Sequence, residues 1–244
     1  MNVFDLDAEL LSRYESFARS FTTIRAKDIS TQVENIYRSG KFWPEPLIGV
    51  NPHFAPGRTL LEMAEEGIVD PDLPKIFALG ADRAPISLHR HQDQSLSKAL
   101  QGRNYIVTTG TGSGKSLCFF VPIIDRILKA RRAGEAQRTR AIVIYPMNAL
   151  ANSQCEELEK FIKDCCISPH LKPTFERYTG QESDSERKRI AAAKPDILLT
   201  NFMMLELLMT RQDGLDQNVV ANMEGLEFLV LDELHTYRGR QGAD

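Results

Sequence analysis

Apolar and polar positions follow two different patterns along this chain. The segment 8–21 has apolar residues at the spacing of one helical face, which predicts an amphipathic helix. Four prolines in the segment 41–57 exclude a regular helix there and predict an extended connection. A short helix is predicted over 59–67, because Thr59 can cap its start and Gly67 can end it. Residues 1–87 are therefore predicted to be a mainly helical, proline-rich accessory region with no visible chemistry.

From residue 88 onward, apolar runs of strand length alternate with helical patterns. Helices are expected over 91–100, 115–131, 149–164, 183–193 and 202–209, and strands over 105–109, 141–145, 174–178, 196–200 and 227–231. Short apolar strands that alternate with helices indicate a parallel sheet with helices on both faces. The predicted fold class is therefore α/β, with one such domain over residues 88–244.

Composition adds that the chain is an ordinary globular protein, with 42% hydrophobic and 26% charged residues. The first residues lack a basic start followed by an apolar stretch, and the most apolar segment, 197–209, is interrupted by Asn201 and Glu206. These features predict a cytoplasmic protein without a membrane span. The four cysteines have no CxxC spacing, which favours reduced thiols over disulfides or a metal site.

The net charge of −3 is unevenly distributed. Residues 1–87 hold 9 Lys and Arg against 13 Asp and Glu, whereas residues 88–244 hold 21 against 20. Phosphate binding depends on local basic surface, so the net charge excludes no nucleic-acid partner. Basic clusters at 129–132, 138–140 and 187–189 are more typical of solvated helix faces than of phosphate contacts.

A glycine-rich turn separates the strand predicted over 105–109 from the helix predicted over 115–131. Backbone N–H groups of such a turn point at phosphates, and the helix dipole adds positive potential. Lys115 can reach the outer phosphates, and the Ser116 hydroxyl can ligate Mg²⁺. The usual motif begins with glycine where this chain has Thr109, so a plain glycine turn stays open as an alternative. The candidate nucleotide-binding residues of the turn are Thr109, Gly110, Thr111, Gly112, Ser113, Gly114, Lys115 and Ser116.

The sequence FLVLDELH (228–235) places acidic residues at the end of an apolar strand. Asp232 would hold Mg²⁺, and Glu233 would polarise the water that attacks a triphosphate. An Asp-Glu pair at a strand end is also common on protein surfaces, and His235 taken alone would be a structural histidine. Combined with the phosphate loop on a neighbouring strand, the pair predicts an ATPase.

The order of these segments resembles the first motor domain of superfamily 2 helicases of the DEAD/DEAH-box kind. LHRHQDQSL (88–96) resembles the Q motif, TTGTGSGKS (108–116) motif I, and DELH (232–235) motif II. The family tolerates a residue other than glycine at the place of Thr109. The resemblance implies a RecA-like fold with ATP and Mg²⁺ as cofactors. It also implies that Gln92 contacts the adenine base and that His235 couples the ATP site to a partner domain.

Three further segments, at 145–154, 179–183 and 198–206, resemble the family's strand-end motifs. The resemblance implies that their loops follow the backbone of a single nucleic-acid strand. Backbone N–H groups and small hydroxyls bind phosphates without reading bases, which suits a translocating motor. The implied nucleic-acid contacts are Pro146, Asn148, Thr179, Gly180, Thr200 and Asn201.

The segments TNFMMLE (200–206) and LDELHTYRGRQGAD (231–244) resemble helicases similar to YprA and Lhr, and large anti-phage helicases such as that of Druantia. This likeness implies DNA rather than RNA, and a defence role with partner proteins. Because the 244 residues contain no second RecA-like domain with its arginine fingers, we expect the ATP-binding, N-terminal part of a longer helicase or translocase. Alone it should hydrolyse ATP poorly. A nucleic-acid-binding scaffold that does not unwind, and an unrelated P-loop ATPase, stay open as alternatives.

Overall fold

The computed structural model describes residues 3–21, 23–40, 43–44, 54–80, 82–110 and 112–237. The chain divides into two compact units, Met1–Pro52 and His53–Asp244, and each is described by itself. The boundary between the units precedes the predicted boundary between residues 87 and 88. The reason is that apolar residues between 60 and 88 share the core of the second unit.

The first unit contains two helices, α1 (Val3–Ser20) and α2 (Lys27–Arg38). α1 confirms the predicted helix and begins five residues before it, whereas α2 was not predicted. The side chain of Arg19 joins them, through an ion pair with Glu34 (2.6 Å) and by lying over the ring of Tyr37. α2 contains no buried residue, and Phe17 of α1 is 61% exposed. The first unit therefore has little core of its own.

Short elements open the second unit and pack onto its main core. They are β1 (Pro56–Thr59), α3 (Leu60–Glu65), α4 (Leu73–Ile76), β2 (Ala78–Leu79), β3 (Ala84–Pro85), β4 (Ser87–His89) and α5 (Arg90–Leu100). β1 pairs with β4 and β2 with β3, both antiparallel. The predicted cap of α3 is confirmed, because the Thr59 hydroxyl accepts from the Glu62 N–H (3.1 Å). Leu60 and Met63 are fully buried, which fixes this segment to the larger domain.

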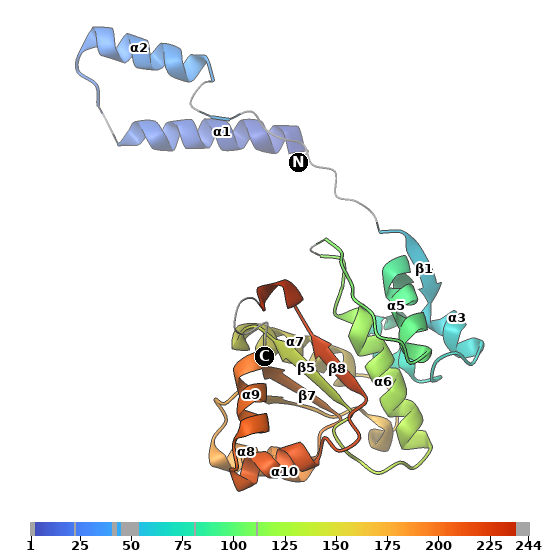
Figure 1. The fold of residues 1–244 in the computed structure, drawn as a ribbon. Coiled ribbons are helices and arrows are strands. Elements are labelled where there is room, and N and C mark those ends of the chain that lie inside the picture. The colour runs from blue at the N-terminus through green and yellow to red at the C-terminus, as the bar shows by residue number, and fades with distance from the viewer. Residues whose placement is uncertain are drawn as a thin grey trace. The chain divides into compact units, whose positions relative to one another are not determined.

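A four-stranded parallel sheet in the order β6-β7-β5-β8 forms the centre of the second unit (Figure 1). Its elements are α6 (Leu117–Arg132), β5 (Ala141–Tyr145), α7 (Asn148–Ile162), β6 (Phe175–Tyr178), α8 (Asp184–Ala193), β7 (Ile197–Asn201), α9 (Phe202–Thr210), α10 (Gly214–Ala221) and β8 (Phe228–Leu231). Two 3-10 turns, Pro169–Leu171 and Leu234–Thr236, complete it. The predicted α/β fold with a parallel sheet is confirmed, and α10 is a helix that the pattern did not predict.

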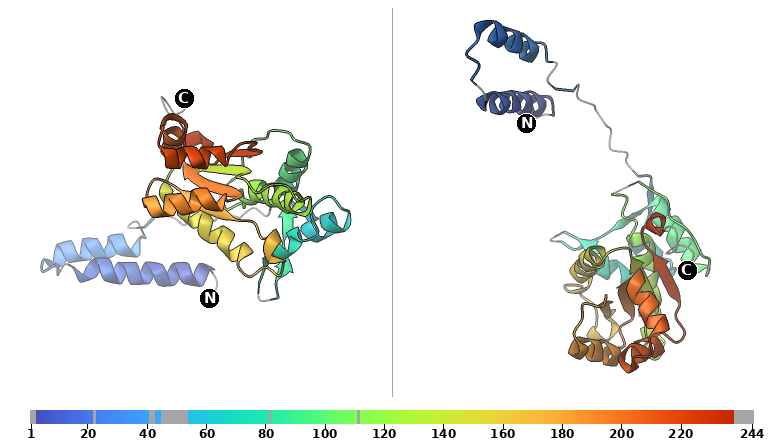
Figure 2. Two further views of the ribbon diagram at one scale, coloured as in Figure 1. Left: turned by 90° about the horizontal axis from the view of Figure 1, so that it is seen from below. Right: turned by 60° about the vertical axis from the view of Figure 1, so that its left-hand side comes forward.

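Alternate residues of each strand face two different cores. Val143 and Tyr145 of β5 pack with α6 and α7, together with the short elements that open the unit. Ile142 and Ile144 pack with α8, α9 and α10 on the other face. Figure 2 shows helices on both sides of the sheet, as the unbroken apolar strands predict.

The strand predicted over 105–109 is not formed. This segment is tied to α6 by the hydroxyl of Tyr105, which donates to the Cys118 carbonyl (2.7 Å), while Ile106 is 78% exposed. β8 is the last strand in the order of the sheet and pairs with β5 on one side only. Leu229 on β8 is accordingly 56% exposed. The apolar run predicts burial of side chains, but a strand also needs backbone partners, and segment 105–109 has none in the described chain.

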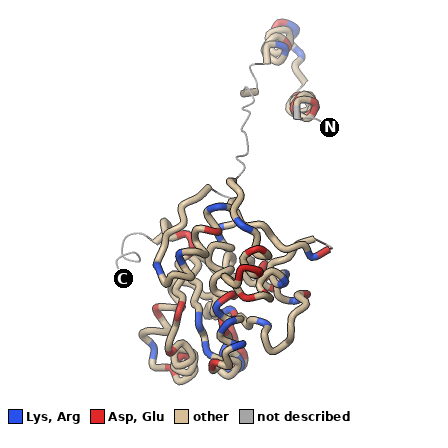
Figure 3. Tube along the Cα trace, turned by 90° about the vertical axis from the view of Figure 1, so that its right-hand side faces the viewer, with Lys and Arg blue, Asp and Glu red and all other residues tan. Residues whose placement is uncertain are grey.

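The three basic clusters are engaged in ion pairs rather than simply solvated. Arg132 binds the carboxylates of Asp70 and Asp72, and Arg187 binds Asp216 (2.6 Å). Arg131 and Arg140 pair in the same way with Asp196 and Glu227. Figure 3 shows acidic and basic positions interleaved along the trace. These arginines are therefore engaged by carboxylates of the fold and are not free for phosphate.

No helix in the described ranges is long and apolar enough to cross a membrane.

Candidate functional site

Side chains in the first turn of α5 form hydrogen bonds with the predicted phosphate loop. Gln92 is 2% exposed, and its side-chain amide donates to the carbonyls of Ser113 (3.3 Å) and Gly114 (2.9 Å). Its Oε1 accepts from the backbone N–H of His89 (2.8 Å), within the capping box of α5. The His91 ring lies 3.0 Å from the Ser113 carbonyl. Gln92 therefore joins α5 to the loop, and its predicted contact to adenine stays a prediction.

Two glycines allow the loop to turn. Gly112 has a φ of +74° and Gly114 a φ of +67°, in the left-handed region that other residues disfavour. A Cβ at Gly114 would also lie 2.7 Å from the Nε2 of Gln92. At the start of the loop, the hydroxyls of Thr109 and Ser113 lie 2.6 Å apart and share a hydrogen bond. The threonine that replaces the motif's first glycine thus closes the loop through its side chain.

The loop presents an anion site at the start of α6. The Lys115 ammonium donates to the carbonyl of Thr109 (3.3 Å). Backbone N–H groups from 112 to 116 have no acceptor among the described residues. Such N–H groups, a helix start and an ammonium together attract phosphate. Gly110 is exposed, and Thr111 lies outside the described residues.

The acidic motif directly follows β8. Asp232 continues the ladder, because its N–H donates to the Ile144 carbonyl (2.9 Å). Glu233 has a φ of +48°, which is a strained conformation for a residue with a side chain. Its N–H donates to Asp232 Oδ1 (3.0 Å), and its carboxylate lies 3.2 Å from the Nδ1 of His235. The turn thus fixes all three predicted side chains relative to the end of β8.

Charge connects this acidic turn to the phosphate loop. Burial raises the pKa of the Asp232 carboxyl, and Lys115 acts in the opposite direction as a nearby positive charge. Lys115 and Asp232 are therefore near enough to interact electrostatically, and their joint role at a nucleotide stays a prediction. The described residues contain no cluster of three or more His, Cys, Asp or Glu that would form a metal cage. One carboxylate and one hydroxyl fit Mg²⁺, which uses few protein ligands when phosphates complete its shell.

The predicted strand-end residues converge at the carboxyl edge of the sheet. Asn201, the last residue of β7, caps α9 by accepting from the Met204 N–H (2.7 Å). Its amide donates to Asn148 Oδ1 at the start of α7 (2.5 Å) and to the Thr179 carbonyl (3.1 Å). Half-buried Pro146 follows β5. Three loops that are distant in sequence are therefore linked side by side.

Internal contacts occupy several groups that the sequence assigns to a nucleic-acid strand. The hydroxyl of Thr200 is buried and donates to the Tyr178 carbonyl (2.6 Å). The N–H groups of Thr179 and Gly180 both donate to the Glu182 carboxylate (2.8 Å each), and the Thr179 hydroxyl does so at 3.0 Å. The Thr200 hydroxyl therefore joins β6 to β7, and the predicted contact of this hydroxyl to nucleic acid would require it to leave that bond. In the neighbouring loop, the Glu182 carboxylate accepts the N–H bonds that a phosphate would otherwise accept.

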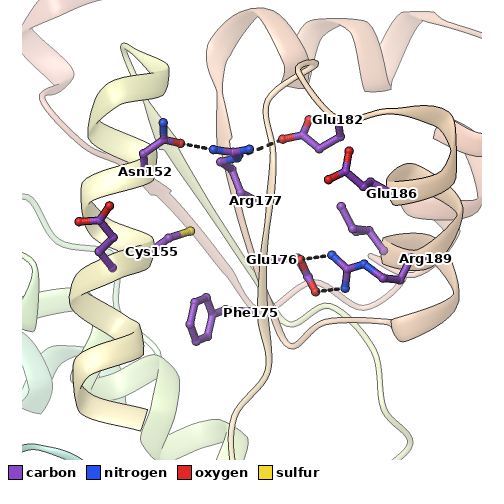
Figure 4. Close-up of a pocket in the computed structure, with 10 residues that line it drawn as sticks. Asn152, Cys155, Phe175, Glu176, Arg177, Glu182, Glu186 and Arg189 are labelled. Carbon is purple, nitrogen blue, oxygen red and sulfur yellow. Dashed lines mark hydrogen bonds and ion pairs between the residues drawn. The ribbon is translucent and has the colours of Figure 1, made fainter. Parts of the chain in front are cut away.

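A pocket of about 390 Å³ lies beside the edge strand β6, between α7 and α8 (Figure 4). Arg177 reaches across it, donating to Asn152 Oδ1 (2.6 Å) and to Glu182 Oε1 (3.2 Å). On the α8 side, Arg189 forms two hydrogen bonds with the Glu176 carboxylate. These paired charges do not form an apolar ligand cavity. They connect α7 to the loop that contains Thr179.

Sequence reasoning missed His91, Arg177 and Glu182. His91 and the predicted Gln92 both reach the Ser113 carbonyl, and the Glu182 carboxylate bonds to both the Arg177 guanidinium and the Thr179 loop. The only signal for Glu182 was its position two residues after Gly180, where a carboxylate can fold back onto the turn. His91 and Glu182 lie inside segments that resemble family motifs, but the resemblance assigned no contact to either side chain, and Arg177 lies in none of these segments.

Comparisons with known proteins agree with this geometry. A model of the DEAD/DEAH box helicase family matches residues 89–244. The uncharacterized ATP-dependent helicase YprA of Bacillus subtilis is 30% identical over 169 residues, covering 69% of this chain and 21% of the relative. Druantia protein DruE of Escherichia coli is 29% identical over 56% of this chain and 8% of its own length. The ATP-dependent RNA helicase DBP9 of Kluyveromyces lactis is 31% identical over 59% of this chain and 23% of its own.

Solved structures show the same fold. The DUF1998 helicase MrfA bound to DNA and AMPPNP superposes with a TM-score of 0.62 at 24% identity, covering 83% of this chain and 26% of that chain. The Mycobacterium smegmatis helicase Lhr bound to ssDNA and AMP-PNP has a TM-score of 0.52 at 24% identity, covering 63% and 19%. The predicted likeness to YprA, Lhr and the Druantia helicase is confirmed. The chain spans about a fifth of the length of YprA.

Proposed function

Because this chain belongs to the DEAD/DEAH box helicase family, we propose that it is the ATP-binding lobe of an ATP-dependent nucleic-acid helicase or translocase. One observation carries the proposal. Lys115 of the phosphate loop lies near enough to the acidic turn for its charge to oppose the rise in the pKa of Asp232, and the carboxyl edge of the same sheet joins the loops of Asn148, Thr179 and Asn201. A nucleotide site and a strand site on one rigid sheet are what a motor needs.

The residues of the nucleotide site divide the work of phosphoryl transfer. The free N–H groups of the loop and the Lys115 ammonium bind the phosphates, and Ser116 with Asp232 holds Mg²⁺. Held there, the cation would neutralise charge that develops on the phosphate oxygens. Glu233 orients the attacking water and accepts its proton. His235, 3.2 Å from the Glu233 carboxylate, relays the state of this site to a second RecA-like lobe.

Gln92 takes a supporting role in this proposal. Its amide bonds to the carbonyls of the loop keep the N–H groups on the other side of the peptide units turned towards the phosphates. Reading of the adenine base by Gln92 stays a prediction from the family resemblance. Gly110, Thr111 and Thr109 complete the loop around the nucleotide.

The nucleic acid in this proposal is DNA, held along the carboxyl edge by Pro146, Asn148, Thr179, Gly180 and Asn201. The solved structures of MrfA and Lhr contain DNA, which supports DNA over RNA. RNA is the competing ligand, because an RNA helicase is also among the relatives. The likeness to DruE supports a role in anti-phage defence with partner proteins of such a system. Residues 1–87 would serve as an accessory region to the domain at 88–244.

The test measures ATP turnover by this chain alone and by its full-length parent, with and without single-stranded DNA or RNA. Turnover that needs the parent and rises with DNA is expected, because an arginine finger from a second lobe contributes roughly 10³–10⁵ in rate. Turnover by this chain that is indifferent to either strand would contradict the proposal. Binding of DNA without ATP-dependent unwinding by the parent would instead indicate a scaffold.

Two substitutions assign the roles within the nucleotide site. Lys115→Ala should weaken binding of a fluorescent ATP analogue, whereas Glu233→Gln should leave binding intact and abolish turnover by the parent. The exposed Lys98 of α5 offers a matched control, because Lys98→Ala removes the same charge away from the loop. Normal hydrolysis by Glu233→Gln would show that another group activates the water.

A further inference from the structure

Tyr145, the last residue of β5, is 0% exposed, yet its hydroxyl has no hydrogen-bond partner among the described residues. A buried hydroxyl without a partner is destabilising, because it has lost its bonds to water and gained none. Buried polar groups of this kind are few in native proteins, and each needs a physical explanation. A phenylalanine would fill the same space without this penalty, so packing alone does not account for the hydroxyl.

The strand register places Tyr145 beside Asp232. Ile144 lies opposite Leu231, and the Asp232 N–H donates to the Ile144 carbonyl (2.9 Å), so the next residue on each strand is a lateral neighbour. Side chains alternate between the faces of a sheet. Tyr145 packs in the core beneath α6 and α7, and Val230, two residues before Asp232, packs in the same core. Asp232 therefore leaves β8 on the face that Tyr145 occupies.

The electrostatics agree with this placement. Burial raises the pKa of Tyr145, and the negative charge of Asp232 is the next cause. A tyrosine hydroxyl is ordinarily protonated at neutral pH, so towards a carboxylate it acts as a hydrogen-bond donor. One oxygen of Asp232, Oδ1, already accepts from the Glu233 N–H (3.0 Å). A carboxylate has further lone pairs, so a second donor can bind without displacing Glu233.

We propose that Tyr145 is a positioning residue for the nucleotide site: its hydroxyl donates to the Asp232 carboxylate when Asp232 turns to hold Mg²⁺. This inference rests on the proposed function, in which Asp232 is the carboxylate that binds the cation. A metal-binding carboxylate is commonly held by a hydrogen bond from behind, which fixes its rotamer and tunes its affinity. The hydroxyl has no partner among the described residues, and Asp232 would supply one when it holds the cation.

The molecule provides a matched comparison in Tyr178. It is equally buried, at 1% exposed, but its hydroxyl donates to Asp216 Oδ1 (2.6 Å) and it packs in the other core, with α8 to α10. Tyr145→Phe and Tyr178→Phe therefore remove the same hydroxyl group from two buried sites that differ in hydrogen bonding. The first removes a hydroxyl without a partner, and the second removes a bonded one.

The experiment uses the 244-residue chain and two readouts. Thermal unfolding without nucleotide should give a melting temperature for Tyr145→Phe that equals or exceeds the wild-type value, and a lower one for Tyr178→Phe. Titration of Mg²⁺ at fixed fluorescent ATP analogue should give a half-saturating Mg²⁺ concentration that is about tenfold higher for Tyr145→Phe, the usual size of such a supporting contact. Tyr178→Phe should leave the Mg²⁺ titration unchanged.

A double-mutant cycle isolates the contact. In an Asp232→Asn background, Tyr145→Phe should have no further effect on Mg²⁺ dependence, because the carboxylate that it positions is gone. An unchanged Mg²⁺ titration for Tyr145→Phe, or a loss of stability as large as that of Tyr178→Phe, would overturn the inference. If nucleotide binding by the wild-type chain does not depend on Mg²⁺ at all, the proposed role of Asp232 fails, and the inference fails with it.

Discussion

The phosphate loop at 109–116 and the loop at 179–180 contain the same kind of backbone N–H groups in opposite states. In the phosphate loop, Gln92 and Thr109 hold the backbone from the side, and the N–H groups from 112 to 116 have no acceptor in the described part of the chain. In the loop at 179–180, the equivalent N–H groups already donate to Glu182. One loop presents open donors, and the other presents donors that an internal carboxylate satisfies.

This difference bears on how each site works. An anion enters the phosphate loop without displacing another anion, so binding there depends on the loop keeping its shape. A strand phosphate at the Thr179 loop must replace Glu182, so binding there is a competition between two anions. A motor that moves along a strand has to release each phosphate, and an internal competitor favours release. The comparison predicts that loss of a side chain that supports the phosphate loop weakens nucleotide binding. It also predicts that loss of Glu182 strengthens binding of a nucleic-acid strand.

The largest expected effect is at Gln92. Gln92→Ala removes one buried and two part-buried hydrogen bonds and leaves their partners unsatisfied, which should cost about 1–3 kcal/mol of unfolding free energy. If Gln92 only shapes the loop, affinity for ATP, GTP and tripolyphosphate should fall equally, by roughly tenfold. Isothermal titration with the three ligands checks this. The exposed Gln94 on the same helix serves as the control, as Gln94→Ala.

An effect of Gln92→Ala on ATP alone, with tripolyphosphate unaffected, would show instead that Gln92 reads the adenine base. That outcome would restore the role implied by the family resemblance. It would also mean that the bonds to Ser113 and Gly114 rearrange when the nucleotide binds.

A smaller effect is expected at Thr200. Thr200→Val leaves the Tyr178 carbonyl without its buried donor, so the unfolding free energy should fall by about 1–2 kcal/mol. Affinity for a single-stranded oligonucleotide should be unchanged, because the hydroxyl lies inside the sheet. Denaturant unfolding and fluorescence anisotropy measure the two quantities. Weaker strand binding at unchanged stability would mean that Thr200 contacts the strand after all.

The smallest effect is expected at Glu182, and its sign is the most informative. Glu182→Gln removes the charge that competes with strand phosphates, so affinity for the oligonucleotide should rise about twofold to fivefold, the size of an ordinary charge-pair effect. Glu186→Gln is the matched control, because it removes the same charge four residues away, where Glu186 caps α8. Anisotropy titrations at two salt concentrations compare them. Equal changes in oligonucleotide affinity for both variants would mean that only the net charge matters and that Glu182 does not compete with phosphate. A decrease in affinity for Glu182→Gln would show that Glu182 supports the loop.

The local patterns predicted most of the second unit. The strands at 141–145 and 196–200, and the capped helix that begins after Ser183, appear within a residue of their predicted bounds. These elements depend on short-range properties, namely the period of apolar residues and capping within one turn. The same reasoning failed at 105–109, because strand formation there depends on a partner that lies far away in sequence.

Functional residues divide in a similar way. The motifs identified Lys115 and Asp232, and the charge of Lys115 opposes the rise in the pKa of Asp232 that burial causes, which is consistent with one site. The patterns had no means of showing that Glu182 folds back onto Thr179, that the Thr200 hydroxyl points into the sheet, or that Arg132 reaches Asp70. Each of these depends on which side chain fills the space beside a polar group.

The sequence by itself determined the parallel α/β sheet, most of the strands and helices of residues 88–244, and the types of residue at the candidate nucleotide site, since these follow from periodicity and from motifs a few residues long. Only the tertiary structure decided which polar groups are available. In the folded protein the Gly180 N–H donates to Glu182, and the Gln92 amide donates to the phosphate loop. The Tyr145 hydroxyl, beside Asp232, has no partner among the described residues. The physical reason is that a hydrogen bond depends on distances of a few tenths of an ångström between groups that the chain brings together only when it folds.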